Sequence, residues 1–274
     1  MKLRLTWLLL GGLAVSVASL VAQEAQPLAA PAIKAAPLAA PAVNPLISRI
    51  ALGSCMKQDR PMPVLRTVRE FQPELFVWLG DNIYGDTNDM DVLAAKYARL
   101  GRQPDFSALR AEVPMVATWD DHDYGVNDGG REYSKKEASK EVFLRFWGEP
   151  AETARRQRSG IYTSYRFTDP KSKRTLQLIV LDTRTFRSPL VKHTVLSYKN
   201  DYRPDASPGN TFLGAEQWAW LEEQLRQPAD LRLIASSIQF AHEYNGYESW
   251  TNFPNEVEKM VQLIATTRAN GVVF

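Results

Sequence analysis

Acidic side chains gather around one histidine in the stretch 118–130, whose sequence is Thr-Trp-Asp-Asp-His-Asp-Tyr-Gly-Val-Asn-Asp-Gly-Gly. The histidine is His122, and four carboxylates flank it: those of Asp120, Asp121, Asp123 and Asp128. Carboxylates this close in sequence repel one another, so a fold keeps them on a solvated surface or around a cation that neutralises them. The apolar run 113–119 predicts a buried strand, and the glycine-rich sequence after it predicts a loop.

His122 has the chemistry of a proton donor. If one neighbouring carboxylate binds a cation, His122 lies next to a bound substrate, where it can protonate a departing alkoxide or stabilise a phosphoryl oxygen. A solvated loop histidine or a helix N-cap is the alternative. His193 lies in a polar loop and is expected to have no role, while His242 follows a predicted strand and either interpretation stays open.

Two more residues of metal-ligand type directly follow predicted strands. Cys55 ends a Gly-Ser-Cys turn after the run 49–54, and Asp81 follows the run 75–79. Layered α/β folds place the carboxyl ends of their strands at one edge of the sheet, where reactive loops meet. We therefore expect Cys55, Asp81 and Asp121 to converge. A buried small hydrophobe is one alternative for the single cysteine, and a nucleophile is another.

Tyr84 stands three residues after Asp81 in the same turn. At this spacing a carboxylate and a phenolate can face one point. A carboxylate can bridge two cations, and a tyrosinate suits a trivalent ion such as Fe³⁺, because a high charge lowers the pKa of the phenol. The alternative makes Tyr84 a packed aromatic residue and Asp81 a turn residue.

Strand and helix patterns alternate from residue 47 onward, which predicts a layered α/β fold. The expected strands are 49–54, 75–79, 113–119, 161–167, 176–182, 231–238 and 271–274. The expected helices are 64–71, 92–100, 134–147, 214–226 and 254–268, and the expected core tryptophans are Trp119, Trp218 and Trp220. The polar turn 169–174 predicts that the strands around it form a hairpin.

The composition fits one large domain, because 45% of the 274 residues are hydrophobic. The net charge of +2 gives no basic field that would argue for nucleic acid. Cys55 is the only cysteine, so an intramolecular disulfide is excluded.

The N-terminus predicts export to the periplasm or the extracellular space. A basic start and the apolar run 5–22 are typical of a signal peptide, here 1–22, with an uncleaved anchor as the alternative. We expect no stable membrane anchor after its removal. Residues 23–46 are rich in Ala and Pro and predict a linker, so the folded domain is expected over 47–274.

Several motifs resemble those of the PhoD-type alkaline phosphatases, in the family's order. They are Gly-Ser-Cys (53–55), Trp-Leu-Gly-Asp-Asn-Ile-Tyr-Gly-Asp (78–86), Thr-Trp-Asp-Asp-His-Asp-Tyr-Gly-x-Asn-Asp (118–128) and Leu-Asp-Thr-Arg-x-Phe-Arg (181–187). Leu-Gly-x-x-Gln-Trp-x-Trp-Leu (213–221), Ser-Ser-Ile-Gln (236–239) and Glu-x-Trp-x-x-Phe-Pro (248–254) extend the resemblance. It implies a calcineurin-like metallophosphoesterase with a four-layer αββα sandwich that acts on a small phosphate ester.

The resemblance also implies the ligands. Cys55 and Tyr84 are expected to bind iron, and Asp81 to bridge the metals, with Ca²⁺ accompanying Fe³⁺. Asp121 stands where many relatives have a metal-binding Asn, and His122 stands at the adjacent catalytic histidine.

Three further residues have weaker assignments. Asn127 is expected to add a ligand or to contact the phosphate. Arg184 and Arg187 either hold phosphate, whose oxygens match a guanidinium fork, or form structural ion pairs.

In the family, a strand like 271–274 leads into a Gly-Asp-x-His segment that supplies late metal ligands. The sequence ends before such a segment, so we expect a truncated, incomplete fold with weakened metal binding. Two hypotheses follow. The first is an exported phosphoesterase that hydrolyses monoesters or diesters through metal-activated water. The second is a non-catalytic remnant that binds metal or phosphate; a module holding only structural Ca²⁺ is a weaker third.

Overall fold

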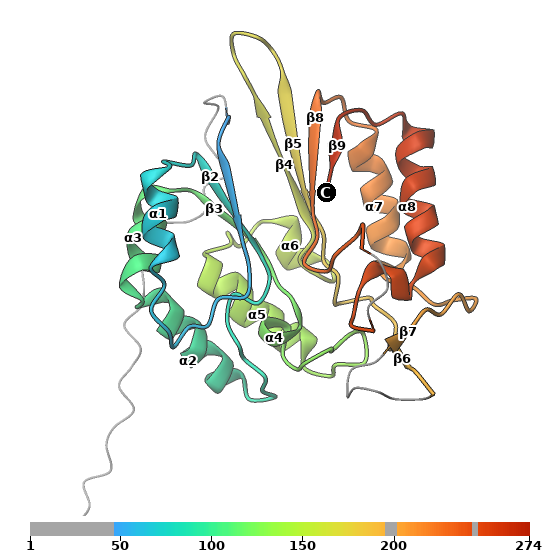
Figure 1. Cartoon of the computed structure of the whole chain (residues 1–274), viewed down its shortest axis with the longest axis horizontal. Helices are drawn as coiled ribbons and strands as arrows, with labels where there is room; N and C mark the ends of the chain where they lie inside the picture. The colour runs from blue at the N-terminus through green and yellow to red at the C-terminus, as the bar shows by residue number, and fades with distance from the viewer. Residues whose placement is uncertain (1–46, 195–201, 243–245) are drawn as a thin grey trace, which may run out of the picture. The chain divides into compact units, whose positions relative to one another are not determined.

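The structure is a computed structural model, and it describes residues 47–194, 202–242 and 246–274 (Figure 1). These residues all belong to one compact unit of the chain, Ile33–Phe274. The expected signal peptide and linker lie outside the described residues. Among the helices that the structure describes, none is both long enough and apolar enough to cross a membrane.

The first half of the described chain forms a parallel sheet. Its strands are β1 (Ile50–Gly53), β2 (Leu75–Leu79) and β3 (Met115–Thr118), paired in that order. Its outer face is covered by α1 (Val64–Glu70), α2 (Met90–Gly101), α3 (Pro104–Glu112) and α5 (Lys136–Trp147) (Figure 1). Side chains alternate between the faces of a strand, so Trp78 packs toward these helices and Val77 toward the second sheet.

The second half forms a mixed sheet. Strands β4 (Thr163–Thr168) and β5 (Thr175–Val180) make the expected antiparallel hairpin. Strands β8 (Leu231–Ala235) and β9 (Val272–Val273) then extend the sheet in parallel, in the order β4-β5-β8-β9. Helices α7 (Gly214–Leu225) and α8 (Pro254–Thr267) cover its outer face (Figure 1).

Three apolar clusters hold four layers together. Trp78 and Trp147 belong to the cluster between the first sheet and its helices. Val116 and Leu178 belong to the cluster between the two sheets, and Trp218 to the cluster under α7 and α8. The αββα sandwich implied by the resemblance is therefore confirmed.

The predicted loop 118–130 requires a correction, because it begins with a short helix, α4 (Asp121–Tyr124). Asp120 is the N-cap residue, and its N–H donates to the Asp123 carboxylate at 2.6 Å, as in a capping box. Four residues are too few to show a helical period in the sequence. The other short elements are α6 (Ala154–Gln157), β6 (Val191–Lys192), β7 (Tyr202–Arg203) and the 3₁₀ helix η1 (Trp250–Asn252).

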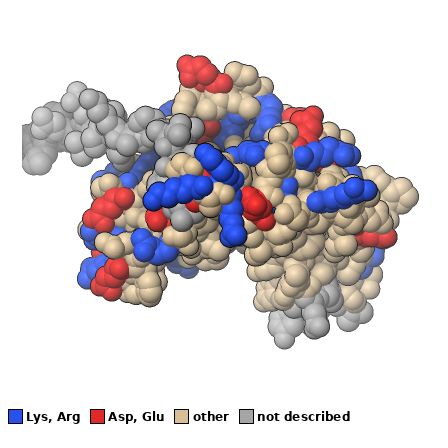
Figure 2. All heavy atoms as spheres, turned by 90° about the horizontal axis from the view of Figure 1, so that it is seen from above, with Lys and Arg blue, Asp and Glu red and all other residues tan. Residues whose placement is uncertain are grey.

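Charged side chains of both signs lie together on the surface. Figure 2 shows one face, on which Asp and Glu side chains interrupt those of Lys and Arg. On the described part of that face the charges are mixed, as a net charge of +2 leads one to expect.

Candidate metal centre

The carboxyl ends of β1, β2, β3 and β8 open onto one cavity of about 300 Å³. The turns that follow these strands form its wall, which is where α/β sheets place their sites. Seven of the residues singled out in the sequence line it: Cys55, Asp81, Asp120, Asp121, His122, Asn127 and Asp128. The strand-end argument therefore placed Cys55, Asp81 and Asp121 together correctly, while their roles as ligands stay predictions.

Cys55, Asp81 and Tyr84 meet where the turns after β1 and β2 lie side by side. Cys55 Sγ lies 3.7 Å from Asp81 Oδ2, and both residues lie near enough to Tyr84 to affect the titration of its hydroxyl. Burial and the nearby charges of Asp81 and Cys55 raise the pKa of Tyr84 above its ordinary value. Burial also raises the pKa of the Cys55 thiol. A bound cation would act in the opposite direction and favour both anions.

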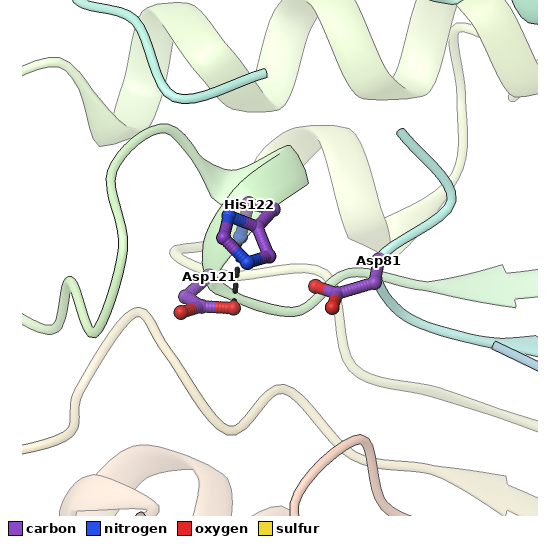
Figure 3. A group of neighbouring side chains, drawn as sticks. All are labelled: Asp81, Asp121 and His122. Carbon is purple, nitrogen blue, oxygen red and sulfur yellow. Dashed lines mark hydrogen bonds between the residues drawn. The ribbon is translucent and has the colours of Figure 1, made fainter. Parts of the chain in front are cut away.

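Asp81, Asp121 and His122 face one point (Figure 3), where one ligand atom from each lies within 4.8 Å of the others. Asp81 Oδ1 is buried and accepts no hydrogen bond from the residues that the structure describes. Burial and the Asp121 charge raise the pKa of Asp81 to about 6. The Asp121 carboxylate is stabilised by two backbone N–H groups: that of His122 donates to its Oδ1 at 2.9 Å and that of Asp128 to its Oδ2 at 2.7 Å.

This donor set fits the ions that the resemblance implies. Carboxylate oxygens are the ligands that Ca²⁺ prefers, and a phenolate suits Fe³⁺. The unpartnered oxygen of Asp81, placed beside a second carboxylate, is costly without a positive charge. A cation at this point removes that cost.

His122 is held from two sides. Its Nδ1 lies 2.7 Å from Asp86 Oδ1, and its ring packs on Tyr84 with the ring centroids 4.3 Å apart. The other ring nitrogen, Nε2, points toward the Asp81 and Asp121 carboxylates (Figure 3). Burial lowers the pKa of His122, but the surrounding carboxylates outweigh burial and raise it overall. The imidazole therefore keeps its proton to a higher pH than a solvated histidine.

Arg184 and Arg187 lie behind the cavity wall and are 1% and 0% exposed. Arg184 donates to Asp120 at 2.7 Å and to Glu248 at 2.6 Å. The Nε of Arg187 lies 3.0 Å from Glu248. Neither arginine is among the described residues that line the cavity. The structure therefore favours the structural ion-pair alternative over direct phosphate binding.

Sequence reasoning missed Asp86 and Glu248. Asp86 ends the motif 78–86 and holds His122. Glu248 starts the motif 248–254 and lines the cavity. Its pairing with Arg184 spans 64 residues, which no local pattern reveals.

The carboxylates of Asp121, Asp128 and Glu248 form a second acidic group, with one oxygen from each within 4.8 Å of the others. The Tyr202 hydroxyl donates to Asp128 Oδ2 at 2.6 Å. Arg184 and Arg187, which pair with Glu248, offset part of this negative charge.

The remaining histidines and tryptophans follow the sequence expectations in part. His193 and His242 are not among the described residues that line the cavity. Trp119 and Trp218 are buried core residues, and Trp220 is partly buried at the edge of its cluster.

A sequence profile described as "PhoD-like phosphatase" matches residues 91–274, which is more than half of the chain and includes α4 with Asp121 and His122. The chain belongs to the PhoD-like phosphatase family. The resemblance noted in the sequence is thereby confirmed.

Two relatives show how much of the family's length is present. The chain is 25% identical over 205 residues to alkaline phosphatase D of Bacillus subtilis (strain 168), which covers 65% of this chain and 33% of that protein. A solved structure titled "Structure of PhoD" matches with a TM-score of 0.64 and 21% identity, over 81% of this chain and 49% of that chain. The likeness to PhoD is one of fold. The chain spans about a third of the curated relative and about half of the solved structure.

Proposed function

We propose that this member of the PhoD-like phosphatase family is an exported, metal-dependent phosphoesterase that hydrolyses phosphate monoesters or diesters. The observation that carries the proposal is the group of Asp81, Asp121 and His122 on the wall of an open cavity. Family membership supports the phosphoesterase activity. The basic, then apolar, N-terminal sequence supports export.

We further propose that iron and calcium occupy this centre. Asp81 would bridge the two ions, Cys55 and Tyr84 would bind iron, and Asp121 would complete the set. When bound, the ions supply Lewis acidity that activates water and polarises phosphoryl oxygens. The buried oxygen of Asp81 that accepts no hydrogen bond supports this assignment.

His122 would give a proton to the departing oxygen of the ester. Asp86 fixes the ring through Nδ1, which leaves Nε2 on the cavity side. The raised pKa of His122 favours the protonated ring. Arg184 stabilises the site from behind, because it neutralises Asp120 and Glu248 and so reduces the repulsion that an anionic substrate meets.

Hydrolysis of p-nitrophenyl phosphate and bis-p-nitrophenyl phosphate by purified protein, loaded with Fe³⁺ and Ca²⁺, tests the proposal. We expect turnover of at least one substrate. Asp81→Asn should abolish both turnover and metal uptake, measured by elemental analysis, whereas Asp91→Asn, on an exposed position of α2, should change neither. Metal uptake without turnover by folded protein would instead support a non-catalytic metal- or phosphate-binding protein. Unchanged metal uptake in Asp81→Asn would exclude the bridging role.

Tyr84 tests the identity of the trivalent ion. We expect Fe³⁺-loaded protein to show a visible tyrosinate-to-iron absorption that Tyr84→Phe lacks. Tyr247→Phe is the control, because Tyr247 lines the same cavity but is not assigned as a ligand. Colour that persists in Tyr84→Phe would rule out Tyr84 as its source.

A further inference from the structure

Asp123 lies directly beneath the candidate centre and is 0% exposed. Its carboxylate accepts hydrogen bonds from three backbone N–H groups, those of Asp81 at 3.3 Å, Asn82 at 3.2 Å and Asp120 at 2.6 Å. The Asn82 side-chain amide and the Tyr97 hydroxyl, at 3.3 Å, add two more. One buried side chain thus joins the turn after β2, the turn after β3 and helix α2.

All five partners of Asp123 are donors. The two oxygens of a carboxyl group accept hydrogen bonds from N–H donors, and four of these five partners are N–H groups, so the surroundings fit a carboxyl group. An amide in its place would present an NH₂ group to N–H donors. The site therefore needs a carboxyl group at position 123, and not only a polar side chain of that size.

The hydrogen bonds of Asp123 matter because they fix the turn after β2, which carries the proposed ligand Asp81. Asp81 has a backbone φ of +49°, a left-handed conformation that is strained for a residue other than glycine and persists only when surrounding contacts enforce it. Asp123 holds the N–H of Asp81 itself and of the next residue. It also belongs to the same helical turn as Asp121. The distance between the two ligand carboxylates therefore depends on Asp123.

We propose that Asp123 is a positioning residue of the metal centre, which holds the Asp81 turn against the Asp121 turn without touching metal or substrate. This inference rests on the proposed function, because it presupposes that Asp81 and Asp121 bind a cation. It assigns a role to the fourth acid of the loop 118–130, beside the proposed ligand Asp121, the cap Asp120 and the rim residue Asp128.

Titrations of Asp123→Asn with Ca²⁺ alone and with Fe³⁺ alone, at 25 °C, test the proposal. We expect affinity to fall about 10–100-fold, the usual effect of losing a residue that supports a metal ligand. Circular dichroism and thermal unfolding of the same sample establish that the variant is folded at the titration temperature.

Glu256→Gln is the matched control. Glu256 is 7% exposed and likewise accepts several hydrogen bonds, from the N–H groups of Phe212 and Leu213 and from Trp218 Nε1, at 2.8 to 3.0 Å. It lies in α8, away from the ligand turns. We expect a comparable loss of thermal stability but unchanged metal affinity, which separates positioning from general destabilisation.

The outcomes are distinguishable. If the wild type binds metal and folded Asp123→Asn binds it equally well, Asp123 has no positioning role, although the proposed function survives. If the wild type binds neither ion, the proposed function falls and this inference with it. If Asp123→Asn does not fold, Asn82→Ala decides, because it removes one donor to Asp123 and leaves the carboxylate. A folded Asn82→Ala with wild-type affinity would then overturn the inference.

Discussion

Two of the proposed ligands have backbone conformations that residues other than glycine seldom adopt. Cys55 has a φ of +58° and Asp81 a φ of +49°. Such a conformation costs about 1–3 kcal/mol per residue and is concentrated at functional sites in proteins. Here it turns each side chain back toward the cavity directly after its strand. The strained backbone is therefore found at Cys55 and Asp81, the residues whose side chains must point toward the proposed metal centre.

At the same scale, Asp86 should matter through His122. Asp86→Asn removes the charge that faces Nδ1 at 2.7 Å, and so loosens the ring and weakens its hold on the proton. We expect kcat to fall about tenfold or more, because a positioned general acid contributes about 10²–10⁴-fold. KM and metal content should stay close to the wild type.

Steady-state kinetics and elemental analysis provide the readout, and Asp91→Asn is again the control. An unchanged kcat in Asp86→Asn would show that His122 does not depend on Asp86. A loss of metal in that variant would instead mean that Asp86 supports the ligands.

At the scale of elements, the centre depends on how closely the strand-end turns approach one another. The Met56 N–H donates to the Asp81 carbonyl at 2.8 Å, which joins the turns after β1 and β2. The Gly85 N–H donates to the His122 carbonyl at 2.9 Å, which joins the turns after β2 and β3. Backbone contacts of this kind leave little room for side chains between the turns.

Gly80 marks that close approach and gives a second prediction. It has a φ of +95°, and a Cβ there would lie 2.5 Å from the Asp120 Cβ and 2.7 Å from its N. Gly80→Ala should therefore push the turns apart, lower the thermal unfolding midpoint and weaken Ca²⁺ affinity in titration.

Gly209→Ala is the control, because Gly209 has a φ of +81° but no atom of the described residues within 4 Å of the added Cβ. It should lose only the stability that the left-handed backbone costs, about 1–3 kcal/mol, and keep its metal affinity. Equal stability losses in the two variants, with metal affinity intact in both, would contradict the close-approach argument.

The order of strands and helices was predictable because the spacing of their apolar residues follows a strand or helix period over several residues. The strand 75–79 matches β2 residue for residue, and the helix 214–226 matches α7 within one residue. Helix α3 was missed, although Phe106 and Leu109 stand at helical spacing, because these are its only two large apolar residues. Helix α4 was missed because four residues are too few to show a helical spacing of apolar side chains.

At the scale of the whole molecule, the two sheets are joined by an apolar layer. Leu178 is 0% exposed within it. Leu178→Ala should lower the free energy of unfolding by about 2–5 kcal/mol, because it leaves a cavity at a site that contacts both sheets. In urea we expect one cooperative transition at lower denaturant, followed by tryptophan fluorescence.

Leu231→Ala is the matched control, because Leu231 begins β8 and is 46% exposed. It should change the unfolding free energy far less. Two separate transitions in Leu178→Ala, or equal losses in both variants, would show that the layer between the sheets does not couple them.

The candidate site was predictable to the extent that it depends on strand ends. Cys55, Asp81 and Asp121 follow strands that lie in one parallel sheet, so their convergence follows from topology. The surroundings of Arg184 and Glu248 depend on how two distant segments pack, and no spacing in the sequence determines that.

The turn between β4 and β5 lies at one end of β5 (Figure 1). The chain leaves the other end of β5 toward the cavity region. Its tip carries two exposed amines, Lys171 and Lys173. A linker attached at Lys171 or Lys173 would tether the protein to a bead or sensor chip with the cavity directed into solution. Immobilised in that orientation, the molecule should exchange cations and small esters as freely as it does unattached.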